Sequence, residues 1–156
     1  WQVNDAISSL KDVQSNVKFN VHIVSCDFKG SNDAAKDAAN FRNWVQKGSF
    51  RNTDGIFVLC RWGGWGISTL GYAYIGDYDV NNDRQSYAIT CTNAWYKYCM
   101  AHEIGHNFGA EHVEMHWYDY LWNTDLMTPG DAGPFKTCKH KNAKNREEIK
   151  RRLTLR

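Results

Sequence analysis

Residues 102–112 read HEIGHNFGAEH, which is the pattern H-E-x-x-H-x-x-G-x-x-H. Residues four apart on an α-helix lie on one face, so His102 and His106 can direct two imidazole nitrogens at a single point. A zinc ion accepts such nitrogens at roughly 2.0–2.1 Å. Glu103 follows the first histidine directly, so its carboxylate lies beside the metal rather than on it. This position suits a general base that acts on water at the metal.

Gly109 and His112 complete the pattern. Glycine accepts the left-handed backbone conformation, so the helix can end at Gly109 and the chain can turn away. That turn is needed to bring His112 back as a third ligand. Three protein ligands leave one position open for water, which distinguishes a catalytic zinc site from a structural one. Two histidines on a helix face are often merely packed, but five fixed residues in this spacing favour a catalytic site.

The stretch resembles the signature of the metzincin clan of zinc endopeptidases, which also have a methionine-containing turn under the metal. Met127, in the sequence LMTP, fits that turn, although alone it would be interpreted as an ordinary core methionine. The resemblance implies one catalytic Zn²⁺ held by His102, His106 and His112. It also implies hydrolysis of peptide bonds, with Glu103 as general base and acid.

Residues 70–76, LGYAYIG, resemble the G-x-A-Y-x-G strand of the adamalysin (reprolysin, ADAM-like) branch. In that branch the strand is the antiparallel edge above the cleft, and the substrate adds to it as a further strand. An unpaired edge offers backbone donors and acceptors to any extended peptide. The alternative is that these residues only form an edge strand. The resemblance implies that substrate binds at Gly71, Tyr72, Ala73, Tyr74, Thr128 and Pro129.

Apolar periodicity predicts an α/β chain in which helices and strands alternate. The expected helices are residues 1–17, Asp33–Gln46 and a zinc helix from Ala94 to about Phe108, and the expected strands are 18–26, Asp54–Cys60, 70–76 and Gln85–Cys91. By resemblance to the metzincin catalytic domain, the sheet should be twisted and mostly parallel, with one antiparallel edge strand and helices on both faces.

The length of 156 residues and a hydrophobic content of 42% fit one globular domain. We therefore expect a single catalytic domain, with an N-terminal subdomain at 1–109 and a small, irregular C-terminal subdomain at 110–156. The family domain usually begins with a strand ahead of its first helix, and this chain starts within that helix, so we expect that an N-terminal segment was removed or that the strand was lost. A propeptide or ancillary domain outside this chain is a separate expectation. Val113 replaces the aspartate usual in adamalysins, and Pro129 replaces the tyrosine of the astacin branch.

The formal net charge of +2 is too small to predict a nucleic-acid partner, and no apolar run approaches the ~20 residues that span a bilayer. Lysine and arginine are concentrated in residues 136–156. Such a tail could bind an anionic surface. A solvated C-terminal helix held by Ile149 and Leu153 is the interpretation we favour.

Five cysteines, together with the proteinase resemblance, predict a secreted protein with one or two disulfide bonds. Cys26 and Cys60 each end an expected strand, so a disulfide between them is predicted if those strands are neighbours. Cys99 falls on the zinc helix, where we expect it to be packed or disulfide-bonded rather than a metal ligand.

Two other stretches leave alternatives open. Residues 77–83, DYDVNND, place oxygen ligands at the first three EF-hand spacings but lack the later glycine and glutamate, so a solvated loop is favoured over calcium. Trp62 and Trp65 in RWGGWG could form an aromatic rim or pack over a turn. A catalytically silent zinc module that binds a partner through this rim is therefore the second functional hypothesis, and the retained Glu103 argues against it.

Overall fold

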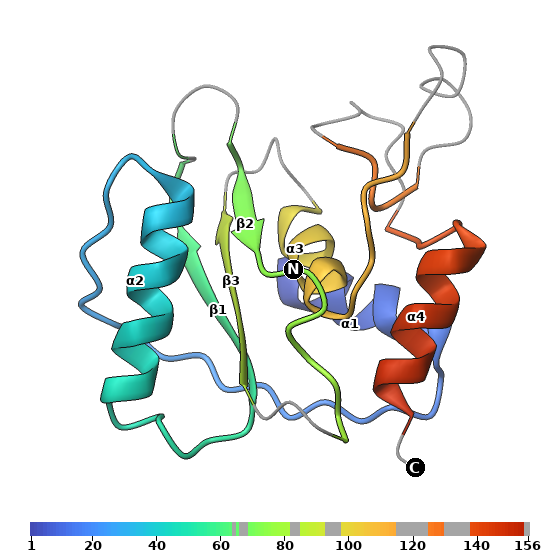
Figure 1. Ribbon diagram of the computed structural model, residues 1–156, viewed down its shortest axis with the longest axis horizontal. Coiled ribbons are helices and arrows are strands. Elements are labelled where there is room, and N and C mark those ends of the chain that lie inside the picture. Colours follow the sequence, from blue (N-terminus) through green and yellow to red (C-terminus); the bar gives the residue numbers. More distant parts are fainter. Residues whose placement is uncertain are drawn as a thin grey trace.

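The computed structural model describes residues 1–63, 65, 69–81, 85–92, 98–114, 125–129 and 138–154. These residues form four helices and a small sheet (Figure 1). The helices are α1 (Gln2–Val13), α2 (Ala34–Lys47), α3 (Cys99–Asn107) and α4 (Ala143–Leu153), and the strands are β1 (Gly55–Arg61), β2 (Gly71–Ala73) and β3 (Gln85–Cys91). Within the described part of the chain, no helix has the length and apolar character needed to cross a membrane.

The sheet has the strand order β1-β3-β2. β1 runs parallel to β3, with Gly55 opposite Gln85 and Arg61 opposite Cys91. β2 is antiparallel to β3 and lies at the edge of the sheet, with Gly71 opposite Thr90. The expected mixed α/β fold, with a mostly parallel sheet and one antiparallel edge strand, is confirmed.

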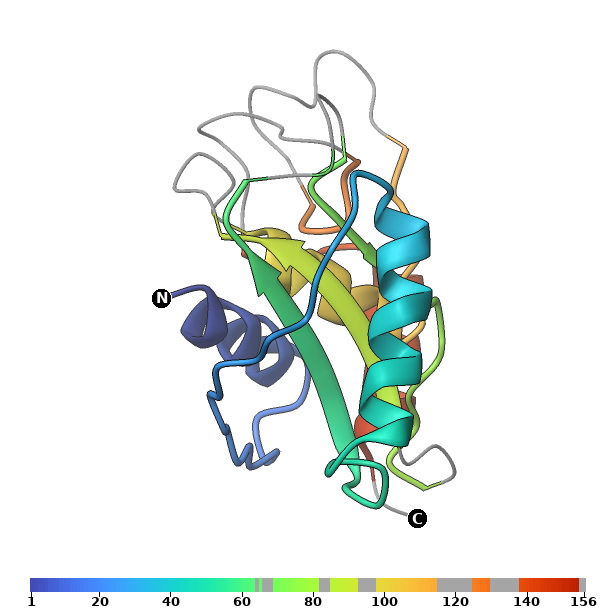
Figure 2. The same cartoon turned by 90° about the vertical axis from the view of Figure 1, so that its left-hand side faces the viewer.

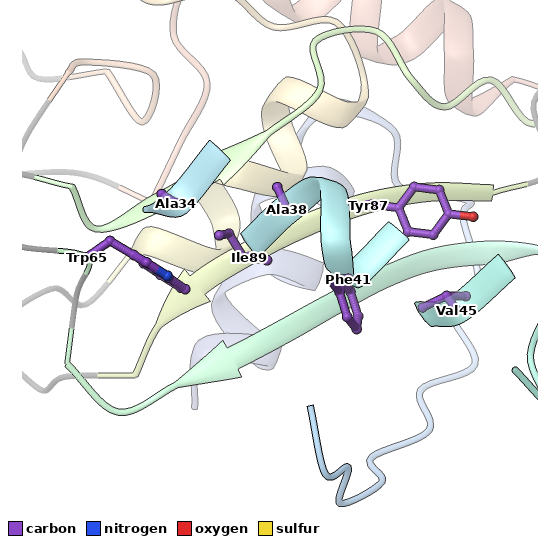
Figure 3. Packing of buried hydrophobic residues seen from close by; sticks show 7 residues of the cluster. All are labelled: Ala34, Ala38, Phe41, Val45, Trp65, Tyr87 and Ile89. Atoms are coloured by element: carbon purple, nitrogen blue, oxygen red, sulfur yellow. The ribbon is translucent and has the colours of Figure 1, made fainter. Parts of the chain in front are cut away.

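Helices cover both faces of this sheet: α2 lies on one side, and α1 and α3 lie on the other (Figure 2). The apolar residues of α2 recur at helical spacing and pack on β3, whose alternate residues face them. Figure 3 shows this cluster, formed by Ala34, Ala38, Phe41, Val45, Trp65, Tyr87 and Ile89. In β1, Phe57 and Leu59 pack against this cluster, whereas Ile56 and Val58, which alternate with them, pack in the clusters on the opposite face of the sheet.

The strand predicted at residues 18–26 is wrong, because the structure has no regular element there. Its alternating apolar residues do not form a buried face: Val21 is 48% exposed, Ile23 84% and Val24 61%. A strand depends on ladder hydrogen bonds to a neighbour, and β-propensity only describes how well a side chain fits such a surface. No described strand pairs with this segment.

The predicted disulfide between Cys26 and Cys60 depended on two neighbouring strands, and that condition is not met. Both cysteines are exposed, and no disulfide links any of the five cysteines. The expected edge strand at 70–76 is also shorter than predicted, since β2 ends at Ala73. The first helix ends at Val13 rather than at residue 17.

Asp37 fastens α2 to the sheet and to the loop before it. Its buried carboxylate accepts hydrogen bonds from the Ser31 N–H (2.8 Å) and the Trp65 indole (2.7 Å) and lies 3.7 Å from the Arg61 guanidinium. Burial alone would raise the pKa of Asp37. The hydrogen bonds and the positive charge of Arg61 outweigh burial and hold the pKa below its usual value of 3.8.

We expect Asp37→Asn to lower the free energy of unfolding by about 2–4 kcal/mol, because buried donors lose a charged acceptor. Because the pKa of Asp37 is lowered in the folded state, its stabilisation is complete above pH 3.8 and is lost as pH falls below it. Urea unfolding at pH 7 and pH 3 measures both effects. The exposed Asp27→Asn is the control. Equal stability of both variants at pH 7 would contradict this role.

Candidate metal centre

Three histidines converge on one point beside α3. His102 and His106 lie one turn apart on this helix, and His112 comes from the segment that follows it. Their Nε2 atoms are 3.1–3.2 Å from one another. Three nitrogens bound tetrahedrally to one zinc ion lie about 3.3–3.4 Å apart, so this spacing fits a single ion. Among the described residues, no other group of histidine, cysteine and acidic side chains is close enough to share a metal ion.

Hydrogen bonds at the Nδ1 atoms of His102 and His106 explain why their Nε2 atoms need a cation between them. His102 Nδ1 lies 2.8 Å from the Leu126 carbonyl oxygen, and His106 Nδ1 lies 2.7 Å from that of Ala110. A carbonyl oxygen only accepts hydrogen bonds, so each Nδ1 carries the proton and each neutral ring has a lone pair on Nε2. Two such lone pairs 3.2 Å apart repel each other unless a cation lies between them. The residues present therefore fit a zinc ion.

The electrostatics of His106 favour the form that binds metal. The pKa of His106 is lowered to about 4, chiefly because the ring is buried. The hydrogen bond to Ala110 acts in the opposite direction and raises the pKa, and the charge of nearby His112 lowers it further. The ring is consequently neutral at pH 7, and a neutral imidazole is the form that coordinates a metal.

The turn predicted at Gly109 is present. Gly109 has a φ of +82°, and its N–H donates to the His106 carbonyl oxygen at 2.8 Å, which ends the helix. The next N–H, of Ala110, donates to the Gly105 carbonyl oxygen at 3.0 Å. A residue with a side chain is strained at this φ, so glycine is required where the chain turns back towards His112.

Met127 is fully buried and lies against the zinc helix. A Cβ atom added to Gly105 would lie 2.7 Å from Met127 Sδ and 2.8 Å from His140 Cε1. The close contact between α3 and the methionine turn therefore requires a glycine at position 105. The Met127 carbonyl oxygen accepts a hydrogen bond of 3.1 Å from the Val113 N–H. This bond connects the turn to the segment that carries His112.

Asp125, which the sequence did not indicate as functional, organises the methionine turn. Its buried carboxylate accepts hydrogen bonds from the Met127 N–H (2.7 Å), the Lys141 N–H and the Asn142 N–H (2.8 Å). Leu126, between the two turn residues, presents its carbonyl oxygen to the ligand His102. Asp125 thus positions the carbonyl group that orients His102, a candidate metal ligand. An aspartate just before the LMTP sequence is the only signal that the sequence offers for this role.

Glu103 is buried and lies against the edge strand. A Cβ atom added to Gly71 would be 2.5 Å from Glu103 Oε1. The structure therefore brings together two residues predicted separately, the general base and the first residue of the substrate-binding strand. No side chain fits at position 71 without displacing the Glu103 carboxylate.

The other predicted substrate-binding residues lie on or just after the edge strand and after the methionine turn. Among the described strands, β2 pairs with β3 alone, so its other edge has no partner strand. Tyr72 is 37% exposed, and its ring packs edge-on against Tyr74 at 5.8 Å. Asn107, at the end of α3, donates to the carbonyl oxygens of Tyr74 (3.2 Å) and Tyr87 (3.1 Å), which holds the strand end to the zinc helix. Of the remaining candidates, Ala73 ends β2, and Thr128 (buried) and Pro129 (exposed) follow Met127 directly.

The structure separates the two tryptophans of the glycine-rich loop. Trp65 is 3% exposed and hydrogen-bonds to Asp37, whereas Trp62 is 80% exposed. The aromatic-rim interpretation is therefore wrong for Trp65, because packing on α2 takes up its ring. In the acidic loop, Asp79 bonds to the Asn81 N–H and lies 3.4 Å from Arg151. Calcium binding at residues 77–83, which the sequence pattern did not favour over a solvated loop, stays untested.

Comparisons with known proteins agree with this geometry. A family model described as metallo-peptidase family M12B, reprolysin-like, matches residues 3–113. This chain belongs to that family. The crystal structure of metalloproteinase-II from Bacteroides fragilis is similar to it, with a TM-score of 0.79 and 30% sequence identity. The match covers 95% of this chain but only 45% of that protein's chain. The expected class, a zinc metallopeptidase, is confirmed at the level of the family.

We expect Gly71→Ala to lower kcat at least tenfold, because a general base contributes roughly 10²–10⁴-fold and its carboxylate would be displaced. The clash involves the flexible end of Glu103, so zinc content and Tm should stay at wild-type values. Metal analysis, thermal unfolding and peptide-cleavage kinetics test this. A fully active Gly71→Ala would show that the Glu103 carboxylate is not needed in this position.

We expect Asp125→Asn to weaken zinc binding roughly 10–100-fold, the usual effect of losing a group that orients a ligand. One amide oxygen cannot replace two carboxylate oxygens that accept three N–H groups. Zinc affinity is measured by competition with a chromogenic chelator. Asp12→Asn is the matched control, because Asp12 is partly exposed and pairs with Lys139 and Arg146 of the C-terminal segment rather than with the N–H groups that Asp125 accepts. Equal zinc affinities in the two variants would contradict the role of Asp125.

Proposed function

We propose that the domain is an endopeptidase in which His102, His106 and His112 hold one catalytic zinc ion and Glu103 is the general base and acid. The observation that carries this proposal is the meeting of three Nε2 atoms within 3.2 Å of one another. His102 and His106 are buried, whereas His112 is exposed, so solvent reaches the triad from the His112 side. An exposed side leaves room for water and substrate at the fourth position.

Zinc, when bound, supplies Lewis acidity that lowers the pKa of a coordinated water and polarises the scissile carbonyl group. Glu103 accepts the proton of the attacking water and then delivers it to the leaving amine. Gly71 leaves the carboxylate space to reach that proton, because position 71 presents only backbone to it. The Leu126 and Ala110 carbonyl groups keep the two helix histidines in the tautomer that binds metal.

The substrate we propose is an extended stretch of protein or peptide that adds to the edge of β2 with which no described strand pairs. Antiparallel pairing with Gly71, Tyr72, Ala73 and Tyr74 would recognise the main chain of any sequence. Tyr72 is exposed beside this edge and can contact substrate side chains. Thr128 and Pro129 follow the methionine turn and are the proposed wall for the residue after the scissile bond.

Secretion of the domain is also part of the proposal, and it rests on the five cysteines and on the family. The match spans 45% of the chain of the B. fragilis protein. We also propose that this domain is accompanied by a propeptide or an ancillary domain in a longer protein. A catalytically silent zinc module remains the competing function. The exposed Trp62 is the observation that favours it.

The decisive experiment compares Glu103→Gln with Glu111→Gln in the zinc-loaded protein. Both variants exchange a carboxylate for an amide near the triad, but Glu111 is exposed and pairs with Lys144 at 2.6 Å. We expect Glu103→Gln to retain one zinc per chain and to cleave a denatured protein at least 10³-fold more slowly. Glu111→Gln should keep wild-type activity, and a chelator should abolish it.

Zinc-loaded wild-type protein that cleaves no denatured substrate would favour the silent binding module instead. Activity that persists in Glu103→Gln would refute the assignment of the general base. Activity that survives full removal of zinc would refute the metal mechanism itself.

A further inference from the structure

Cys91 and Cys99 bring two thiol groups together at the base of the zinc helix. Their sulfur atoms are 3.5 Å apart, and the two residues are separated by eight positions in the chain. Cys91 is the last residue of β3 and is fully buried, and Cys99 is the first residue of α3 and is half-buried. We propose that these two cysteines are an oxidative modification site: they form a disulfide bond that fastens the zinc helix to the central strand.

Both cysteines are held by rigid elements, so the approach of their sulfur atoms is a property of the fold. The Cys91 N–H donates to the Leu70 carbonyl oxygen at 2.8 Å, and Cys91 lies opposite Arg61 in the parallel ladder. Met100 and Ala101, which follow Cys99, are buried in the cluster that also contains Ala6 and Leu126. A disulfide needs a sulfur–sulfur distance of about 2.05 Å, so the two atoms must approach by about 1.5 Å.

The other cysteines are placed differently. Cys60 lies opposite Thr90, not opposite Cys91, and successive residues of a strand point to opposite faces. Cys26 and Cys60 are both exposed. Cys138 Sγ donates to the Asp5 carbonyl oxygen at 3.1 Å. Among the five cysteines, Cys91 and Cys99 are thus the pair whose sulfur atoms are in contact, one at the end of β3 and the other at the start of α3.

A small-molecule disulfide such as oxidised glutathione is sufficient as oxidant. The Cys99 thiolate, the more accessible of the two, attacks one glutathione sulfur and forms a mixed disulfide, and one glutathione thiolate leaves. Cys91 then loses its proton to solvent and attacks the Cys99 sulfur, which expels the second glutathione thiolate. The protein loses two protons and two electrons, which together are two hydrogen atoms, and one oxidised glutathione becomes two reduced glutathiones.

The consequence concerns the chemistry carried by α3. His102 lies three residues after Cys99, so the bond would fix the first turn of the helix that carries two zinc ligands and Glu103. Closing so short a loop restrains the unfolded chain and should raise Tm by roughly 5–10 °C for a domain of this size. The site would therefore keep its shape in an oxidising environment even when zinc is scarce.

The test uses zinc-loaded protein incubated with oxidised or with reduced glutathione. Trypsin cleaves after Lys97, so a bond between the two cysteines would join the peptides 85–97 and 98–136 in a non-reducing digest. We expect this joined peptide, a mass loss of two hydrogen atoms per chain, and the rise in Tm. Cys26→Ser and Cys60→Ser are matched controls that should retain all three results, whereas Cys99→Ser should lose them.

Two results would overturn the proposal. The first is that, after treatment with oxidised glutathione, both Cys91 and Cys99 can be alkylated in the unfolded, unreduced protein, which would show that their thiols are still free, or that Cys91 is joined to another cysteine. The second is that the joined peptide forms but Tm does not rise, which would show that the disulfide does not stabilise the contact between α3 and β3. Because the peptide map is made on the wild-type chain, the test does not depend on whether Cys99→Ser folds.

Discussion

The close approach of three imidazole nitrogens, two of which carry lone pairs that repel each other, is the constraint on which the rest of this structure depends. The Nε2 atoms of the three histidines lie within 3.2 Å of one another, and two of the rings are fixed in one tautomer by carbonyl oxygens behind them. Such an arrangement has to be held by the surrounding protein, because the ligands alone would separate without a cation. The glycine turn after the helix and the methionine turn are the elements that hold it.

The C-terminal helix α4 supports these elements from the opposite side. Its Asn145 exchanges hydrogen bonds with the backbone of Glu111, next to the third ligand. Arg152 donates to the carbonyl oxygens of Gly76 and Tyr78, beyond the edge strand, and its Nε bonds to Glu148. These contacts give structural roles to Arg151 and Arg152 of the basic tail, which hold Glu148 ionised with a pKa of about 2. Through Asn145 and Arg152, α4 is connected to the segment that carries His112 and to the segment that follows the edge strand.

The features of the site that the sequence predicts correctly are those whose chemistry is local. The positions of His102, His106 and Gly109 follow from the geometry of one helix and its end, so the motif alone predicts them. The role of Asp125 depends on donors 16 and 17 positions away, and the approach of Gly71 to Glu103 joins two distant elements. The failed strand at residues 18–26 has the same cause, because strand pairing is decided by a neighbour that the segment itself does not encode.

The burial of the site is uneven, and this asymmetry has a chemical meaning. Glu103, His102 and His106 are each at most 8% exposed, yet His112 is exposed, and among the described strands β2 has a partner on one side only. A buried carboxylate next to a metal acts strongly on a proton because little water screens its charge. An open edge, in contrast, has to be accessible to a long and variable chain. Glycine at position 71 reconciles the two requirements: it lets the open strand touch the buried carboxylate without a side chain between them.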